Sequence, residues 1–248
     1  PEATAYVARM DPAPDDARKA LIDTLFSSLK SAGVLSKLDA LWLMAAHAAQ
    51  AGRLNLVSSS YELSAINGPS FTTDRGYQGD GSSSYLKTGL ILSTAAKFTR
   101  NSASLGFWSL TNSSTDTFAM GARVNINTQQ NIIAPRNIAG NLEGRVNVGA
   151  SPGGAATGNS LGLSSASRTA PTTTNIYKNG VSASTYINAS EAPAALELYL
   201  LGGNGNGSLI LPTQRRGAAA FAGSGLDGTE MLDLYNALNT YLTAIGAV

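Results

Sequence analysis

The sequence predicts a mainly β protein, a two-sheet antiparallel sandwich of the jelly-roll type, with helices only near its two ends. Three observations carry this prediction. Apolar and polar residues alternate in LGFWSL, FAMGARVNI and GRVNV, as they do in strands with one buried face. Gly, Ser, Thr and Asn crowd the chain after about residue 57, and charged residues make up only 13% of it. No helical periodicity separates the predicted strands, which favours a sandwich over an α/β fold.

The alternation also predicts which side chains share a face. The inward face of the predicted strands carries Leu105, Phe107, Phe118, Met120, Val124, Ile126, Val146 and Val148. The opposite face carries Trp108, Arg123, Asn125, Arg145 and Asn147.

The stretch TNIYKNGVS predicts a β-hairpin with Asn179-Gly180 at its turn. Both central residues of a type I′ turn need a positive φ, which Asn tolerates and Gly adopts freely. A turn of this kind indicates two paired strands and by itself says nothing about function.

Both ends of the chain show helical spacing. Apolar residues recur at helical intervals between Asp15 and Lys30, and the apolar segment LDALWLMAAHAAQAG (38–52) follows, with Ser36 and Asp39 as a capping pair. Together these predict an N-terminal helical hairpin. The segment 225–246 predicts a short C-terminal helix with Asp227 or Thr229 as its cap. We therefore divide the chain into a helical segment, 1–56, and a β-sandwich domain, 57–248.

Composition excludes several functions. The formal charge of +1 provides no basic surface for nucleic acid. The absence of cysteine excludes disulfides and thiolate metal sites. No apolar run approaches the roughly 20 residues that a membrane span needs.

Catalytic residues are not predicted. Glycoside hydrolysis needs two carboxyl groups flanking the scissile bond, but residues 81–190 contain only Asp116 and Glu143, and no predicted strand there carries two acids at i, i+2. The only histidine, His47, lies in the apolar segment, so a serine nucleophile has no candidate base.

No cofactor is predicted, although calcium remains an open alternative. Asp80, Asn204 and Asn206 could supply the oxygen ligands that Ca²⁺ prefers. We favour ordinary turns for all three positions, because no single loop contains two or three acids.

The outward face has the ingredients of a carbohydrate site. A sugar ring packs its C–H face on an aromatic side chain, while amide and guanidinium groups bond its hydroxyls. If the strands lie side by side, the predicted carbohydrate-binding residues are Trp108, Arg123, Asn125, Arg145 and Asn147. The competing interpretation is that the N-terminal helices cover Trp108.

Three segments, in order, resemble the laminin-G-like branch of the concanavalin A-like superfamily. YQGDGSSSYLKTG resembles its early strand, NIYKNGVS its hairpin, and FAGSGLDGTEMLDLYNALNTYL its closing strand and helix. The matching positions are Tyr77, Gly79, Gly81, Tyr85, Tyr177, Asn179, Gly180, Gly225, Leu226, Glu230, Met231 and Tyr235. The resemblance implies a jelly roll over about residues 75–245. This fold hosts both lectins and glycan-degrading enzymes.

The N-terminal stretch ALIDTLFSSLKSAGVLSKLDALWLMAAHAAQAGRLNL, followed by INGPSFTTDRGYQGDGSSSYL, resembles tailed-bacteriophage and prophage proteins. This resemblance implies a non-enzymatic virion fibre or spike module that binds a bacterial surface polysaccharide. It also implies other virion proteins as partners, a homo-oligomer, and no nucleic acid or membrane partner. Two alternatives stay open, a purely structural virion module and a polysaccharide depolymerase. The chain opens at Pro1, so we expect a preceding segment.

Overall fold

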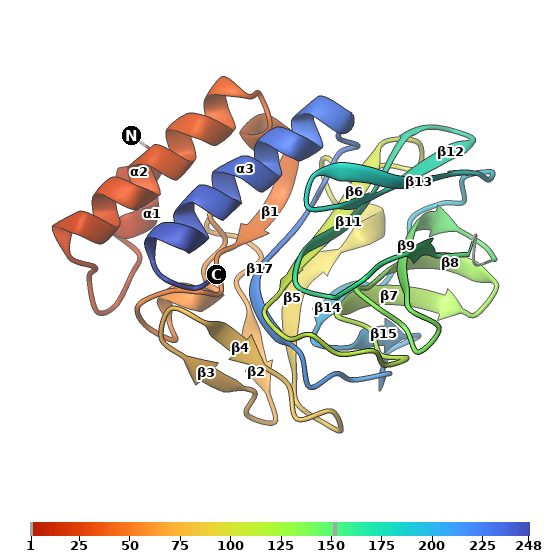
Figure 1. Cartoon of the computed structure of the whole chain (residues 1–248), viewed down its shortest axis with the longest axis horizontal. Helices are drawn as coiled ribbons and strands as arrows, with labels where there is room; N and C mark the ends of the chain where they lie inside the picture. Colours follow the sequence, from red (N-terminus) through yellow and green to blue (C-terminus); the bar gives the residue numbers. More distant parts are fainter. Residues whose placement is uncertain (1, 151–152) are drawn as a thin grey trace.

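Two antiparallel sheets face each other in the computed structural model of the protein, and three α-helices cover the outer face of one of them (Figure 1). The structure describes residues 2–150 and 153–248. This arrangement confirms the predicted fold class, a mainly β sandwich with helices at both ends of the chain.

The sheet that contacts the helices, called sheet A here, has the strand order β13-β12-β11-β6-β17-β4-β3, and β1 also pairs with β17. Its strands in chain order are β1 Leu38–Trp42, β3 Ser70–Thr72, β4 Gly76–Gln78, β6 Ala103–Ser109, β11 Gly162–Ala170, β12 Thr173–Lys178, β13 Val181–Ile187 and β17 Arg216–Gly223.

The opposing sheet, called sheet B, has the order β10-β9-β8-β7-β14-β5-β2, with the β15–β16 hairpin attached to β7. Its strands are β2 Ser64–Ile66, β5 Tyr85–Ile91, β7 Met120–Asn125, β8 Thr128–Ala134, β9 Asn141–Val148, β10 Ala155–Ala156, β14 Glu197–Leu200, β15 Gly203–Gly205 and β16 Ser208–Ile210. Short 3₁₀ turns occur at Leu35–Lys37, Ala51–Arg53 and Leu92–Thr94.

The core between the sheets contains four of the eight predicted inward residues. Leu105, Phe107, Met120 and Val146 are buried there together, which confirms the alternation on which the prediction rested. Val148 is buried outside this cluster, Val124 is half-buried, and two further positions differ from the prediction. Phe118 is buried in a separate cluster with Ile132, Ala134 and Ile210, and Ile126 is 64% exposed in the turn between β7 and β8.

The helices form a third layer over sheet A. They are α1 Glu2–Val7, α2 Asp16–Ser31 and α3 Gly228–Ala244, and Figure 1 shows α2 and α3 side by side. Asp15 caps α2 by accepting a hydrogen bond from the Arg18 amide. Asp227 forms a capping box with Glu230 at the start of α3. Both terminal helices therefore confirm the sequence prediction. Among the described residues, no helix is both long and apolar enough to cross a membrane.

The predicted second helix at 38–52 is wrong, because this segment begins with strand β1 rather than with a helix. All five residues of β1 are buried. Leu41 packs in the core under the helices, while Ala40 and Trp42 pack in the core between the sheets. A strand covered on both faces shows no alternation in sequence, so its apolar run resembled a buried helix. The division at residues 56 and 57 stays a prediction.

Candidate functional site

The five predicted carbohydrate-binding residues do not share one face. Trp108 lies on β6 and packs in the core under the helices, on the outer side of sheet A. Arg123 and Asn125 lie on β7, and Arg145 and Asn147 on β9, both in sheet B. The alternation correctly placed Trp108 away from the central core. However, each sheet of a sandwich has its own outer face, and the outer faces of sheets A and B lie on opposite sides of the molecule.

Sheet B does bring Arg123 and Arg145 together. Arg145 Nη1 donates to Gln130 Oε1 at 2.5 Å, and Arg145 Nη2 forms an ion pair with Glu143. Gln130 is the cross-strand partner of Arg123. The Arg123 guanidinium lies 5.3 Å from the centre of the Phe118 ring. Burial, together with the positive charge of Arg145, lowers the pKa of Arg123.

The side chains of the two asparagines in the predicted set form hydrogen bonds with the backbone of loops. Asn125 Oδ1 accepts a hydrogen bond from the Asn127 amide at 2.8 Å in the β7–β8 turn. Asn147 is fully buried, and its Nδ2 donates to the carbonyls of Thr99 (2.9 Å) and Arg100 (3.1 Å). These contacts fix loop conformations.

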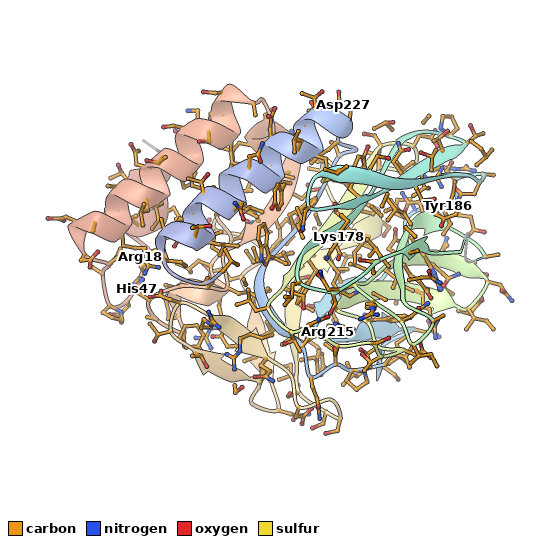
Figure 2. The ribbon with its side chains drawn as sticks, in the orientation of Figure 1. Arg18, His47, Lys178, Tyr186, Arg215 and Asp227 are labelled. Atoms are coloured by element: carbon orange, nitrogen blue, oxygen red, sulfur yellow. The ribbon has the colours of Figure 1, made fainter. Side chains whose placement is uncertain are left out.

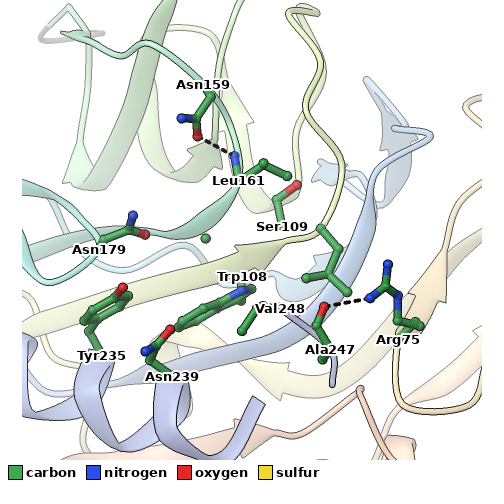
Figure 3. Close-up of a pocket in the computed structure, with 12 residues that line it drawn as sticks. Arg75, Trp108, Ser109, Asn159, Leu161, Asn179, Tyr235, Asn239, Ala247 and Val248 are labelled. Atoms are coloured by element: carbon green, nitrogen blue, oxygen red, sulfur yellow. Dashed lines mark hydrogen bonds between the residues drawn. The ribbon is translucent and has the colours of Figure 1, made fainter. Parts of the chain in front are cut away.

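Trp108 is covered by a helix, as the competing interpretation expected, but the helix is the C-terminal one. Its indole stacks on the ring of Tyr235 from α3, with ring centroids 5.4 Å apart and planes 5° from parallel. Only 2% of Trp108 is exposed. Its Nε1–H is buried and has no hydrogen-bond partner among the described residues. Figure 3 shows the edge that carries this nitrogen turned away from Tyr235 and toward Val248.

A cavity of about 480 Å³ lies beside this stack (Figure 3). It lies where the end of β6, the start of β11, the β12–β13 turn, α3 and the C-terminal residues meet. Its lining residues are Arg75, Trp108, Ser109, Leu110, Asn159, Leu161, Gly162, Asn179, Tyr235, Asn239, Ala247 and Val248.

The predicted Asn179-Gly180 hairpin forms one wall of the cavity. Both residues have positive φ, 51° and 77°, and Lys178 pairs with Val181 across the turn, which confirms the hairpin. Asn179 Oδ1 accepts the Leu163 amide at 2.9 Å, so the amide orientation is fixed and its NH₂ group is left to donate. Gly162 makes room for this contact, because a Cβ there would lie 2.2 Å from Asn179 Oδ1.

Helix α3 and the C-terminal residues form the other walls. Tyr235 and Asn239 are one helical turn apart and so share one side of α3. The Tyr235 hydroxyl and the Asn239 amide have no hydrogen-bond partner within residues 2–150 and 153–248. Arg75 Nη1 donates to the carbonyls of Ala247 (3.0 Å) and Gly246 (3.3 Å), which holds the C-terminal residues against the cavity.

The cavity combines apolar surface with planar polar groups. Tyr235 supplies aromatic surface beside the nearly covered Trp108, and three Asn side chains and one guanidinium are arranged around it. This combination suits a ligand with both C–H faces and hydroxyls. None of the twelve lining side chains, all in the described part of the chain, is a carboxylate. The pair of acids used in glycoside hydrolysis is therefore not part of this cavity.

Sequence reasoning identified Trp108 as the central aromatic residue but missed the residues that surround it. Asn179 and Tyr235 were singled out only as fold-signature positions, and that signal was present in the sequence. Nothing in the sequence points to Asn159, Asn239 or Arg75, which reach the cavity from three separate segments.

Two of the three residues considered for calcium, Asp80 and Asn204, use their side chains in other contacts. Asp80 Oδ1 accepts the amides of Ser82, Ser83 and Ser84. Asn204 donates to the Glu197 carbonyl and accepts the Gly207 amide, and Asn206 has a positive φ of 50°. The described residues contain no group of three His, Cys, Asp or Glu side chains that could hold a metal ion.

Comparison with known proteins gives matches only among solved structures. No family model matches, and no curated protein matches. Domain 4 of AbnA, a GH43 extracellular arabinanase from Geobacillus stearothermophilus solved in complex with arabinotriose, is 17% identical with a TM-score of 0.51. The alignment covers 79% of this chain and 98% of that domain.

Two further matches cover only part of larger chains. A Trypanosoma rangeli sialidase solved in complex with sialic acid is 9% identical with a TM-score of 0.54, over 90% of this chain and 39% of that one. The binding domain of botulinum neurotoxin serotype D is 10% identical with a TM-score of 0.51, over 81% of this chain and 52% of that domain. At these identities the similarities show a shared β-sandwich fold.

Proposed function

We propose that the protein is a non-enzymatic carbohydrate-binding module and that the cavity beside Trp108 holds the sugar. The observation that carries this proposal is the Trp108 Nε1–H, which is buried and has no partner among the described residues. A buried donor without a partner costs about 1 to 3 kcal/mol. A ligand hydroxyl that displaces Val248 from beside the indole edge would remove that cost.

The remaining lining fits the same ligand class. A sugar ring has apolar C–H faces and a rim of hydroxyls, and the cavity has aromatic rings and amide groups in the same small space. The fixed orientation of Asn179 would give the site selectivity, because its NH₂ group can only donate. Arabinotriose, present in the structure of the matched arabinanase domain, belongs to this ligand class, as does sialic acid, present in the structure of the sialidase of which 39% matches.

For the biological setting, we propose a virion fibre or spike that recognises a polysaccharide on the bacterial surface. The support is the likeness of the N-terminal half of the sequence to phage and prophage proteins. In this setting the protein would assemble with other virion proteins. A homo-oligomer is expected, because virion fibres and spikes are commonly closed cyclic oligomers.

The first experiment measures binding of the protein to capsule and lipopolysaccharide fractions from candidate hosts, with the same samples assayed for new chain ends. Saturable binding without cleavage is expected. New reducing or unsaturated ends would replace the proposal with a depolymerase. A folded sample that binds none of the fractions would favour the purely structural module.

The site is tested with a matched pair of variants. Trp108→Phe keeps an aromatic ring against Tyr235 but removes the indole N–H together with part of the bicyclic ring, so binding should weaken about tenfold. Arg123→Gln, on the outer side of sheet B, should bind like the parent protein. The opposite pattern would move the site to the Arg123 and Arg145 face. Thermal unfolding of both variants checks that each remains folded.

A further inference from the structure

Basic side chains gather around the cavity, although the chain has a formal net charge of only +1. Arg75 lines the cavity directly. Lys178 lies immediately behind another lining residue, since its Nζ donates to the Leu161 carbonyl at 2.6 Å. Arg216 lies close to Arg75, since burial and then the charge of Arg75 lower the pKa of Arg216. Figure 2 shows Lys178 and Arg215 in the middle of the molecule, away from Arg18 at its helical end.

These basic residues lack acidic partners. Ion pairs within the described ranges involve Arg9, Arg18, Lys19, Lys30, Lys37 and Arg145. None of them involves Arg75, Lys178, Arg215 or Arg216. Asp74, the acid next to Arg75, is paired with Arg18 at 2.8 Å.

Arg215 is the clearest example of a basic side chain without an acidic partner in the described residues. It is 1% exposed, and its Nη2 donates to the Arg136 carbonyl at 2.9 Å. Its Nε and Nη1 are buried without a partner in the described part of the chain. Burial, reinforced by the nearby charge of Arg136, lowers the pKa of Arg215 to about 10. Burial and the charge of Arg215 similarly lower the pKa of Lys178 to about 8.

Cations that carry no counter-charge create a positive potential, and a low-dielectric cleft focuses it. A neutral sugar would leave that potential unbalanced, whereas an anionic one would offset it. Arg75 lines the cavity itself, whereas Lys178 Nζ also donates to Ser164 Oγ, and Ser164 pairs with Phe107 of the central core. The charges of Lys178 and the neighbouring Arg215 therefore lie across sheet A from the Trp108 stack and act on the cavity through the sheet.

Arg75 indicates which kind of anion fits. Its Nη1 already donates to Ala247 and Gly246. No hydrogen bond within the described residues uses its Nε or Nη2, so one edge of the guanidinium is left with two parallel N–H groups. That edge matches the two oxygens of a planar carboxylate.

We infer that the ligand of the Trp108 cavity is an acidic sugar, a residue bearing a carboxylate that binds Arg75 in the field of Lys178, Arg215 and Arg216. This inference rests on the proposed carbohydrate-binding function and adds the chemical class of the sugar. The carboxylate faces Arg75, and the rest of the ring contacts Trp108 and the asparagines.

The test compares one polysaccharide in two forms. A uronic-acid-containing capsule fraction is measured intact and after chemical reduction of its carboxyl groups to primary alcohols, which keeps the backbone and removes the charge. The intact form should bind at least about tenfold more tightly than the reduced form. The affinity of the intact form should also fall as the salt concentration is raised from about 0.05 to 0.5 M. Equal affinity for both forms would overturn the inference and leave the carbohydrate-binding function standing.

Variants separate charge from geometry. Arg75→Gln should lose most of the preference for the intact form, and Arg75→Lys, which keeps the charge without the parallel donors, should lose part of it. Lys178→Met tests the second basic residue without touching the C-terminal contacts of Arg75. Lys97→Gln removes an exposed lysine outside the cavity and should keep the full preference.

The outcomes remain distinguishable. If neither polysaccharide form binds, the carbohydrate-binding function and the inference both fail. If Lys97→Gln lowers the preference as much as Lys178→Met, the effect comes from overall charge, and the inference fails while the function stands.

Discussion

The indole of Trp108 lies flat on the ring of Tyr235, with 5.4 Å between ring centroids and 5° between their planes. One residue belongs to β6, an interior strand of sheet A, and the other to α3 in the helical layer. This stack therefore joins two layers of the fold and also forms part of the cavity wall.

Replacing Tyr235 should weaken the contact between these layers. Tyr235→Ala removes the stacked ring, and we expect the free energy of unfolding to fall by about 1 to 3 kcal/mol. Tyr235→Phe should change it by less than about 0.5 kcal/mol, because the ring is kept. Urea unfolding measures both. If Tyr235→Phe costs as much as Tyr235→Ala, the hydroxyl rather than the stacked ring is what stabilises the contact.

A second prediction concerns Gly162. Its φ is +82°, and a Cβ there would lie 2.2 Å from Asn179 Oδ1, so Gly162→Ala should destabilise the protein by about 1 to 3 kcal/mol. Sugar binding should also weaken, since Asn179 must move. Gly158→Ala is the matched control in the same loop region, because a Cβ at Gly158 would meet no atom within 4 Å. The prediction fails if the two alanine variants have the same midpoint of unfolding and the same sugar affinity.

A third prediction tests the corrected N-terminal segment. Asp39 is 6% exposed, and its two carboxylate oxygens accept the amides of Lys97 (2.9 Å) and Phe98 (2.8 Å). Asp39→Ala leaves both amides without their acceptor and should cost about 2 kcal/mol or more. Asp39→Asn keeps one acceptor oxygen and should cost less. Chemical unfolding would reject this role if Asp39→Ala had the stability of the parent protein.

The lowered pKa of Lys178 leads us to expect that the stability of the protein depends on pH. Burial first, and then the charge of Arg215, lowers its pKa from 10.5 to about 8 in the folded state. Between these values the unfolded chain binds more protons than the folded one, so this residue makes stability rise with pH across that window. Its Nζ contacts the Leu161 carbonyl and the Ser164 hydroxyl, and Arg215 is the charged group whose repulsion lowers its pKa.

The measurement compares parent and Lys178→Met at several pH values from 7 to 11. The stability of the parent relative to the variant should rise by about 1 to 3 kcal/mol across the window. This difference removes the contribution of the other lysines and the tyrosines. Parallel stability curves would show that Lys178 keeps its ordinary pKa in the folded protein.

The elements that the sequence predicted well are those whose pattern is local. The capping residue Asp227, the Asn179-Gly180 turn and the alternation of Leu105 and Phe107 each follow from a few neighbouring residues. Strand β1 was predicted wrongly because both of its faces are buried. Its apolar run carries no period that separates a strand from a buried helix.

The candidate site was predicted only in part, for a different reason. Period-2 alternation shows that Trp108 and Arg123 point away from the central core, but it does not show which sheet each strand joins. Strand order assigned β6 to sheet A and β7 to sheet B, and this separated the two residues. It also placed Trp108 beside Asn179 and Tyr235, which are 71 and 127 positions later in the chain.

The sequence by itself determined the mainly β architecture, the two terminal helices, the hairpin turn and the near-neutral charge, because each depends on composition or on residues close together in the chain. The tertiary structure alone decided that Trp108 is stacked under α3 beside a cavity, and that Arg75 lines this cavity without an acidic partner in the described residues. Contacts of this kind depend on which strands pair and which faces are covered, and these are properties of the whole fold rather than of any segment.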